Sequence, residues 1–243
     1  AYDALTETQR KLISEDILKK LTDAEALISK LEEENNSQQS TTQKQDSTTI
    51  KTSNNLIVNV SKISTNSVTL KWNKISDATG YKIYGYQAKT KKFVLIKNVN
   101  ANSTSFKVKS IKNAKLLSGK IYYFKVYAYK NKGNDVVLQK QSIKTATAPD
   151  KVKIQKVSSV TSSKIMITWN KVKRSAGYEL WMKTGKTGKY KIVKTIKGAS
   201  KLSYKVTGLK KGKTYYFKVR AYKSVDDKKV YGKTSKVKQV KLK

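Results

Sequence analysis

Residues 209–222 read Leu-Lys-Lys-Gly-Lys-Thr-Tyr-Tyr-Phe-Lys-Val-Arg-Ala-Tyr, which is the pattern of a tight turn followed by a β-strand. Gly212 supplies the bend, because glycine adopts turn conformations that other residues avoid. After the bend the sequence alternates, and a period of two separates the two faces of a strand. The predicted inward set is Tyr215, Phe217, Val219 and Ala221, and the outward set is Tyr216, Lys218, Arg220 and Tyr222.

The same frame occurs earlier, at residues 116–129, as Leu-Leu-Ser-Gly-Lys-Ile-Tyr-Tyr-Phe-Lys-Val-Tyr-Ala-Tyr. Upstream of each frame lies another shared block, which begins Trp-Asn-Lys at Trp72 and at Trp169. The tryptophans are 97 residues apart (169 − 72), and the tyrosines Tyr122 and Tyr215 are 93 apart (215 − 122). A repeat of this length suits one seven-stranded β-sandwich per copy, at about 100 residues each.

The spacing of leucine, glycine and Tyr-x-Phe-x-Val-x-Ala in both frames resembles the tyrosine corner of fibronectin type III domains. The resemblance implies a mainly β protein with two tandem immunoglobulin-like sandwiches. It also implies that the corner tyrosine is buried and that its hydroxyl bonds to backbone upstream. The expected structural core comprises Trp72, Tyr81, Leu116, Tyr122, Trp169, Tyr178, Leu209 and Tyr215.

The first part of the chain follows a helical pattern. Ser14 can cap a helix, and the apolar residues after it recur at spacings of four and three: Ile17, Leu21, Ala24, Ile28 and Leu31. The segment resembles the second half of a small helical-bundle repeat of Gram-positive bacterial surface proteins and large extracellular glycosidases. The alternative is an amphipathic linker helix or a weak coiled coil.

Four parts are therefore expected, which together make a mainly β chain with a short N-terminal α-helical segment. They are a helical segment at 1–35, a polar flexible linker at 36–55, a first fibronectin type III domain at 56–147 and a second at 148–243. The linker is too poor in apolar residues to order itself. Since the sequence begins at Ala1 without a methionine or signal peptide, we expect it to be a piece of a longer protein.

The composition argues against several classes of function. The chain has no cysteine and no histidine, which removes thiolate chemistry, the usual general base and the commonest metal ligand. No apolar run approaches the roughly 20 residues of a membrane-spanning helix. Phosphate loops, metal clusters and nucleophile elbows are missing. We therefore expect a non-enzyme without cofactors, although it could be the accessory part of a larger extracellular enzyme.

The net charge is +37, from 53 Lys and Arg against 16 Asp and Glu. Residues 1–36 contribute 5 basic and 9 acidic side chains, a net of −4, so residues 37–243 carry 48 and 7, a net of +41. Such a surface attracts polyanions and repels its own copies, which favours a monomer in which only the helical segment is a candidate for pairing. Lysine far outnumbers arginine, which suits diffuse attraction more than bidentate recognition.

Aromatic residues that face outward are the candidates for ligand binding. If the inward set of each copy fills the core, an aromatic and lysine face remains on the outside of one sheet. Its rings could stack on sugars or bases while the lysines meet phosphate or carboxylate. The alternative is that cross-strand Tyr–Tyr and Tyr–Lys pairs merely stabilise an exposed sheet. The candidate residues are Tyr84, Tyr86, Tyr123, Lys125, Tyr127, Tyr129, Trp181, Tyr216, Lys218, Arg220 and Tyr222.

The favoured hypothesis is a non-catalytic C-terminal spacer or adhesion region of a secreted or cell-surface bacterial protein. It would position an upstream module and have a secondary affinity for anionic polymers of the bacterial cell wall or of a host. The alternative is a binding module for carbohydrate or polyanion, such as teichoic acid or an acidic glycan, that uses the basic, aromatic face. Sequence-specific nucleic-acid binding is not expected, because no recognised reading motif is present.

Overall fold

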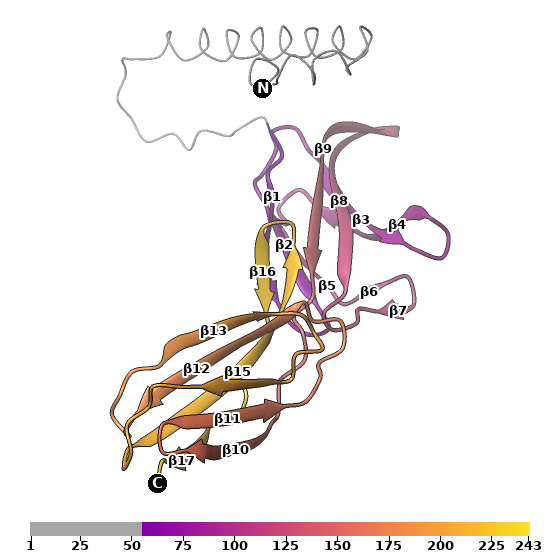
Figure 1. Ribbon diagram of the computed structural model, residues 1–243. Coiled ribbons are helices and arrows are strands. Elements are labelled where there is room, and N and C mark those ends of the chain that lie inside the picture. Colours follow the sequence, from indigo (N-terminus) through magenta and orange to yellow (C-terminus); the bar gives the residue numbers. More distant parts are fainter. Residues whose placement is uncertain (1–54) are drawn as a thin grey trace, which may run out of the picture. The chain divides into compact units, whose positions relative to one another are not determined.

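The computed structural model describes residues 55–243 (Figure 1), so the predicted helical segment and nearly all of the predicted linker lie outside the described residues. Every element in 55–243 is a β-strand, and all strand pairs are antiparallel. Within this part of the chain no helix is long and apolar enough to span a membrane.

The first sandwich is drawn in indigo to pink in Figure 1. Its smaller sheet has the order β1-β2-β5, and its larger sheet has the order β4-β3-β8-β9. A two-stranded hairpin, β6-β7, follows β5. The bounds are β1 Val58–Ile63, β2 Val68–Trp72, β3 Gly80–Gln87, β4 Lys92–Asn100, β5 Ser105–Val108, β6 Ser110–Ile111, β7 Ala114–Lys115, β8 Ile121–Lys132 and β9 Asn134–Ala146.

The second sandwich repeats this plan without the extra hairpin. The smaller sheet has the order β10-β11-β14, and the larger has the order β13-β12-β15-β16, with β17 also paired to β15. The bounds are β10 Ile154–Thr161, β11 Lys164–Trp169, β12 Gly177–Thr184, β13 Lys191–Lys197, β14 Ser203–Val206, β15 Thr214–Val225, β16 Lys228–Tyr231 and β17 Lys238–Lys241.

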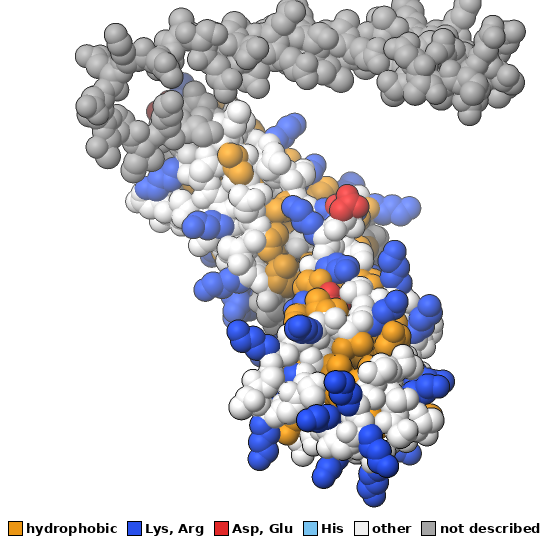
Figure 2. Space-filling view, turned by 60° about the vertical axis from the view of Figure 1, so that its left-hand side comes forward, with side chains coloured by type: hydrophobic (Ala, Val, Ile, Leu, Met, Phe, Trp, Pro, Cys, Tyr) orange, Lys and Arg blue, Asp and Glu red, His pale blue; other side chains and the backbone are white. Residues whose placement is uncertain are grey.

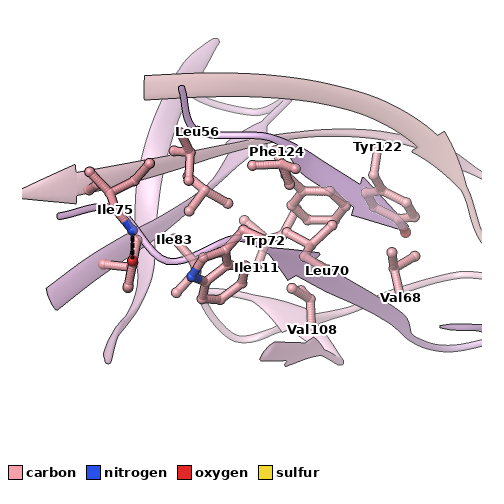
Figure 3. Packing of buried hydrophobic residues seen from close by; sticks show 14 of the residues in the cluster. Leu56, Val68, Leu70, Trp72, Ile75, Ile83, Val108, Ile111, Tyr122 and Phe124 are labelled. Atoms are coloured by element: carbon pink, nitrogen blue, oxygen red, sulfur yellow. Dashed lines mark hydrogen bonds between the residues drawn. The ribbon is translucent and has the colours of Figure 1, made fainter. Parts of the chain in front are cut away.

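Each sandwich has its own hydrophobic core between its two sheets. In the first, the Trp72 and Tyr81 rings lie with centroids 5.4 Å apart, and Figure 3 shows Trp72 with Leu70 and Phe124 in the same layer. The Tyr81 hydroxyl accepts a hydrogen bond of 2.9 Å from the backbone N–H of Ile75. Of the predicted core residues all are buried except Leu209, which is half-buried and packs against the second core.

Both tyrosine corners form as the resemblance implies. The hydroxyl of Tyr122, 7% exposed, accepts a hydrogen bond of 2.7 Å from the backbone N–H of Leu117. The hydroxyl of Tyr215 accepts one of 2.8 Å from Lys210. Gly119 and Gly212 bend the chain between donor and acceptor with φ of 64° and 78°, a region that favours glycine. The corner therefore ties each turn to the strand that follows it.

The hairpin β6-β7 completes the core of the first sandwich. Ile111 of this hairpin is 5% exposed, and a Cβ added to Gly85 of β3 would lie 2.9 Å from its side chain. Gly85 pairs with Phe124, and the corresponding partner of Phe217 in the second sandwich is Met182. Met182 packs against the second core, so its side chain fills the space that Ile111 fills in the first.

Candidate ligand-binding face

The candidate residues of the first sandwich lie on the outer side of the sheet β4-β3-β8-β9. We call this surface the first face and define it by Tyr84, Tyr86, Phe93, Tyr123, Lys125, Tyr127 and Tyr129. Its rings pack on one another, with centroids 5.0 Å apart for Tyr84–Tyr127, 5.4 Å for Tyr86–Phe93 and 6.2 Å for Tyr86–Tyr123. Tyr123 is the most open of these tyrosines, with 44% of its surface exposed, and the others are half-buried.

Cations take part in the first face at two places. The ammonium of Lys125 lies 4.2 Å from the centroid of the Phe93 ring. The ammonium of Lys82 lies 5.1 Å from the Tyr129 ring and forms an ion pair with Asp135. That carboxylate raises the pKa of Lys82 through its hydrogen bond. The first face is thus mostly aromatic, with one lysine paired to a carboxylate.

Two of the predicted outward tyrosines lie beside a glycine on the neighbouring strand. Tyr129 pairs with Gly80 and Tyr222 pairs with Gly177. A Cβ on either glycine would meet the tyrosine hydroxyl, at 2.8 Å for Gly80 and 2.6 Å for Gly177. Each ring therefore lies across the glycine, but Tyr129 is half-buried whereas Tyr222 is only 3% exposed. Two residues of β16 also contact Tyr222: the Tyr231 ring, with centroids 6.3 Å apart, and the ammonium of Lys229, at 5.0 Å. The prediction that Tyr222 is accessible to a ligand is wrong because Gly177 and these contacts together bury its ring.

On the second sandwich, rings and cations alternate along the outer side of the sheet that contains β12 and β15. We call this row the second face. Successive cation-to-ring distances are 5.1, 5.4, 4.1, 5.3, 5.2 and 3.6 Å. The row runs Tyr216, Lys183, Tyr190, Lys218, Trp181, Arg220, Tyr231. Because each cation contacts two rings, the cations hold the rings in place by cation–π attraction.

A buried carboxylate anchors one end of the second face. Glu179 is 2% exposed. Its Oε2 accepts a hydrogen bond of 2.9 Å from Nε of Arg220 and forms an ion pair with Nη2 of the same guanidinium at 2.8 Å. The Tyr231 hydroxyl donates to its Oε1 at 2.8 Å. The ion pair and the hydrogen bonds together offset the free-energy cost of burying this carboxylate. At the corresponding position of the first sandwich stands Lys82, so the two copies place opposite charges there.

The two faces differ in what they offer a ligand. In the second face the rings are already in contact with the protein's own cations, so a sugar ring would have to displace a lysine or arginine. In the first face the rings pack edge to edge and one tyrosine is open. Stacking on a neutral sugar is therefore favoured on the first face only.

Several members of these faces were not among the candidates from the sequence. They are Lys82, Phe93, Glu179, Lys183, Tyr190 and Tyr231. Phe93 belongs to β4 and Tyr190 lies just before β13, the strands at one edge of each larger sheet, and Tyr231 belongs to β16 at the other edge of its sheet. The alternation in the two central strands gives no information about them, because their register depends on the hairpin turns.

Positive charge covers the part of the chain that the structure describes. Residues 55–243 contain 46 Lys and Arg but 6 Asp and Glu, a net of +40. In the view of Figure 2 the blue side chains are spread over the whole visible surface and the red ones are few. Four ion pairs, at Lys82, Lys130, Lys144 and Arg220, occur in this part of the chain. Most of the cations there have no carboxylate beside them.

The hydroxyl of Tyr231 makes the second face sensitive to alkaline pH. Burial raises the pKa of this phenol, and its hydrogen bond to Glu179 raises the pKa further. The folded chain thus favours the neutral phenol, so this contribution to stability is complete below about pH 10 and is lost as the pH rises through the raised pKa.

The expected result is a phenol that ionises above about pH 10 in the native chain. The measurement is a titration followed by phenolate absorbance, in which the difference between wild type and Tyr231→Phe isolates this residue. In urea the same group should ionise near the ordinary value. A native phenol that titrates at or below that value would contradict the hydrogen bond to Glu179.

No group of three or more His, Cys, Asp or Glu that could hold a metal ion occurs within residues 55–243. The side chains described in both faces are chiefly aromatic rings with ammonium and guanidinium groups, besides the carboxylates of Asp135 and Glu179. Such groups bind by stacking and by charge.

Comparison with known proteins gives one family and several similar chains. The model of the family "Fibronectin type III domain" matches residues 54–143 and 148–235, which together are more than half of the chain. A "Kelch domain-containing protein SSO1033" of Saccharolobus solfataricus is 39% identical over 69 residues, which cover 28% of this chain and 9% of that protein. The chain therefore spans less than a tenth of the length of this relative.

Two solved structures are similar at 19% sequence identity. A two-domain fibronectin type III segment of chicken tenascin has a TM-score of 0.43 and matches 76% of this chain and 97% of its own. The FN1–FN3 domains of chicken CNTN1 have a TM-score of 0.38 and match 76% of this chain and 62% of their own.

Proposed function

Because the chain belongs to the fibronectin type III family, whose domains are commonly non-catalytic adhesion or spacer modules, we propose that it is the spacer and adhesion region of a secreted or cell-surface protein. In this role the two sandwiches position an upstream module and hold it near anionic polymers. The observation that carries the proposal is the net charge of +40 on residues 55–243.

Most of this charge is not paired with a carboxylate within residues 55–243. Only four of the cations in residues 55–243 form ion pairs, so the others are available to counter-charges in the surroundings. Cations that meet a polyanion release its condensed counterions, which makes such binding strongly dependent on salt, by analogy with nucleic acid. A bacterial surface, with teichoic acid or acidic glycan as the partner, is the setting that we propose.

The test is chromatography of the full 243-residue chain on immobilised heparin with a rising salt gradient. The chain is expected to elute well above physiological ionic strength, which is about 0.15 M, and to pass unretained through the uncharged matrix. Elution at or below that ionic strength would remove the proposed affinity for anionic polymers.

The first face carries a second candidate function, the binding of neutral carbohydrate. Its support is the open ring of Tyr123, 44% exposed, beside the ring pair Tyr86–Phe93. In this case binding to a neutral glycan would saturate, would persist in high salt and would be lost in Tyr123→Ala. The matched control is Tyr216→Ala on the second face. Equal loss in both variants, or none in either, would speak against this second function.

A further inference from the structure

A groove with lysines on both sides lies within the second sandwich, between the segments that lead into β10 and β17. It has a volume of about 630 Å³ and is lined by Lys151, Val152, Lys153, Ile154, Gln155, Lys236 and Lys238. β10 pairs only with β11, and β17 only with β15. The groove therefore runs along the sandwich where two sheet edges meet.

The lining residues of this groove are of two kinds. Val152 and Ile154 are apolar members of the core, 1% and 4% exposed, whereas all four lysines are exposed. None of the lining residues is acidic. On each side the two lysines stand two residues apart, a spacing of about 6.6 Å in an extended chain. The four lysines thus form two cation pairs, one on each side.

The first sandwich shows that the fold does not require these lysines. The backbone N–H of Lys153 donates to Oδ1 of Asn170 at 2.5 Å. The backbone N–H of Ile57 makes the same bond of 2.7 Å with Oδ1 of Asn73. Ile57 is therefore the counterpart of Lys153. Lys151 lies two residues before Lys153, and the residue two before Ile57 in the first sandwich is Asn55.

The other side of the groove gives the same result. Lys238 pairs with Phe217, and Ile143 pairs with Phe124 at the same place in the first sandwich. The N–H of Ser235 donates to the carbonyl of Val219 at 2.7 Å, and Gln141 pairs with Val126 at that place in the first sandwich. Between these two places the first sandwich has Ser142, where the second has Lys236 and Val237. The residues at the four places in the first sandwich are thus Asn55, Ile57, Ser142 and Ile143, all uncharged, although residues 55–147 contain 18 lysines. A general excess of lysine does not explain why all four positions are cationic in one copy and none in the other.

We propose that this lysine groove is the principal contact for an extended anionic glycan, a polysaccharide that carries sulfate or carboxylate groups. The inference rests on the proposed affinity for anionic polymers and assigns it to one site. The anionic groups meet the four ammoniums, and the C–H faces of the sugars lie against the lysine methylene stems. No aromatic ring lines the groove, so the stacking platform that single-stranded nucleic acids use is missing.

The experiment compares two quadruple variants of the full chain by their affinity for heparin in solution. The groove variant changes Lys151, Lys153, Lys236 and Lys238 to glutamine. The control variant makes the same change at four exposed lysines on β13, β14 and the segment between them: Lys194, Lys197, Lys201 and Lys205. Both variants lose the same charge, so they differ only in where it is lost. Matching thermal unfolding curves establish that both are folded.

The groove variant is expected to bind heparin at least about thirty times more weakly at physiological salt, and the magnitude of its log K against log salt slope should fall by about 3 to 4. The control variant should lose less than threefold. Equal losses in the two variants would overturn the groove and leave the affinity for anionic polymers in place. A wild-type chain that does not bind heparin would overturn both proposals. Tighter binding of single-stranded DNA than of heparin would overturn the choice of a glycan.

Discussion

Replacing Trp169 by alanine is expected to lower the free energy of unfolding of the second sandwich by about 3 to 5 kcal/mol. The indole is 1% exposed and lies with its centroid 5.5 Å from the ring of Tyr178. Its Nε1 has no hydrogen-bond partner within the described residues, so the loss comes from packing and from the cavity left behind. Since a whole domain is stable by only about 5–15 kcal/mol, this one change consumes much of the stability of that sandwich.

The measurement is urea unfolding followed by the fluorescence of the remaining tryptophans. Trp72 reports on the first sandwich and Trp181 on the second, so each transition can be assigned to one sandwich. The control is Trp181→Ala, which removes a half-buried indole from the second face and should cost clearly less. A cost below about 1 kcal/mol for Trp169→Ala would mean that this indole is not part of a packed core.

The second large effect is expected for Arg220→Ala, at about 3 kcal/mol or more. The reason is the carboxylate of Glu179, whose side chain is 3% exposed and faces the guanidinium at 2.8 Å. Removing one partner of a buried ion pair leaves the other charge uncompensated. Tyr231 would still donate to Glu179, but one neutral hydrogen bond does not replace the guanidinium.

Two comparisons separate this effect from the loss of cation–π contacts, and both are read by the same urea unfolding. Lys218→Ala on the same strand removes a cation that contacts Trp181 and Tyr190, and it should cost about 0.5 to 1 kcal/mol. The double variant Arg220→Met and Glu179→Met should be more stable than Arg220→Ala alone, because no unpaired carboxylate remains. If the double variant were the less stable one, the unpaired carboxylate of Glu179 would not be the cause of the loss in Arg220→Ala.

The parts of the fold that the sequence predicts are those that depend on short stretches of chain. Gly212 and Tyr215 lie three residues apart, and the bond from Lys210 to the Tyr215 hydroxyl closes within the same turn. A pattern of this kind is visible without knowing any strand pairing. The alternation in β8 and β15 likewise separates buried from outward residues, because it follows from the geometry of a single strand.

The candidate faces depend on register between strands, and here the sequence is less informative. Tyr222 is buried by Gly177 on β12 and the Tyr231 ring on β16 together, and Gly177 is a neighbour 45 residues away in the chain (222 − 177). Tyr190 and Tyr231 join the second face through Lys218 and Arg220, contacts that only the hairpin turns and bulges determine. The sequence of a single strand shows on which side of the sheet a ring lies, but the residues that contact the ring come from the neighbouring strands.

The first sandwich has Gly85 with Ile111 beside it, and the second has Met182 at the place of Gly85. This difference limits which segments the two copies can exchange. Grafting β3 from the first copy into the second would place glycine where methionine fills the interior and would leave a void. The reverse graft would drive methionine into Ile111, since even a Cβ at Gly85 would lie only 2.9 Å from it. β3 and β12 therefore cannot replace one another alone. Recombination between the copies preserves the core packing only when a complete sandwich is exchanged, which in the first copy includes the hairpin β6-β7.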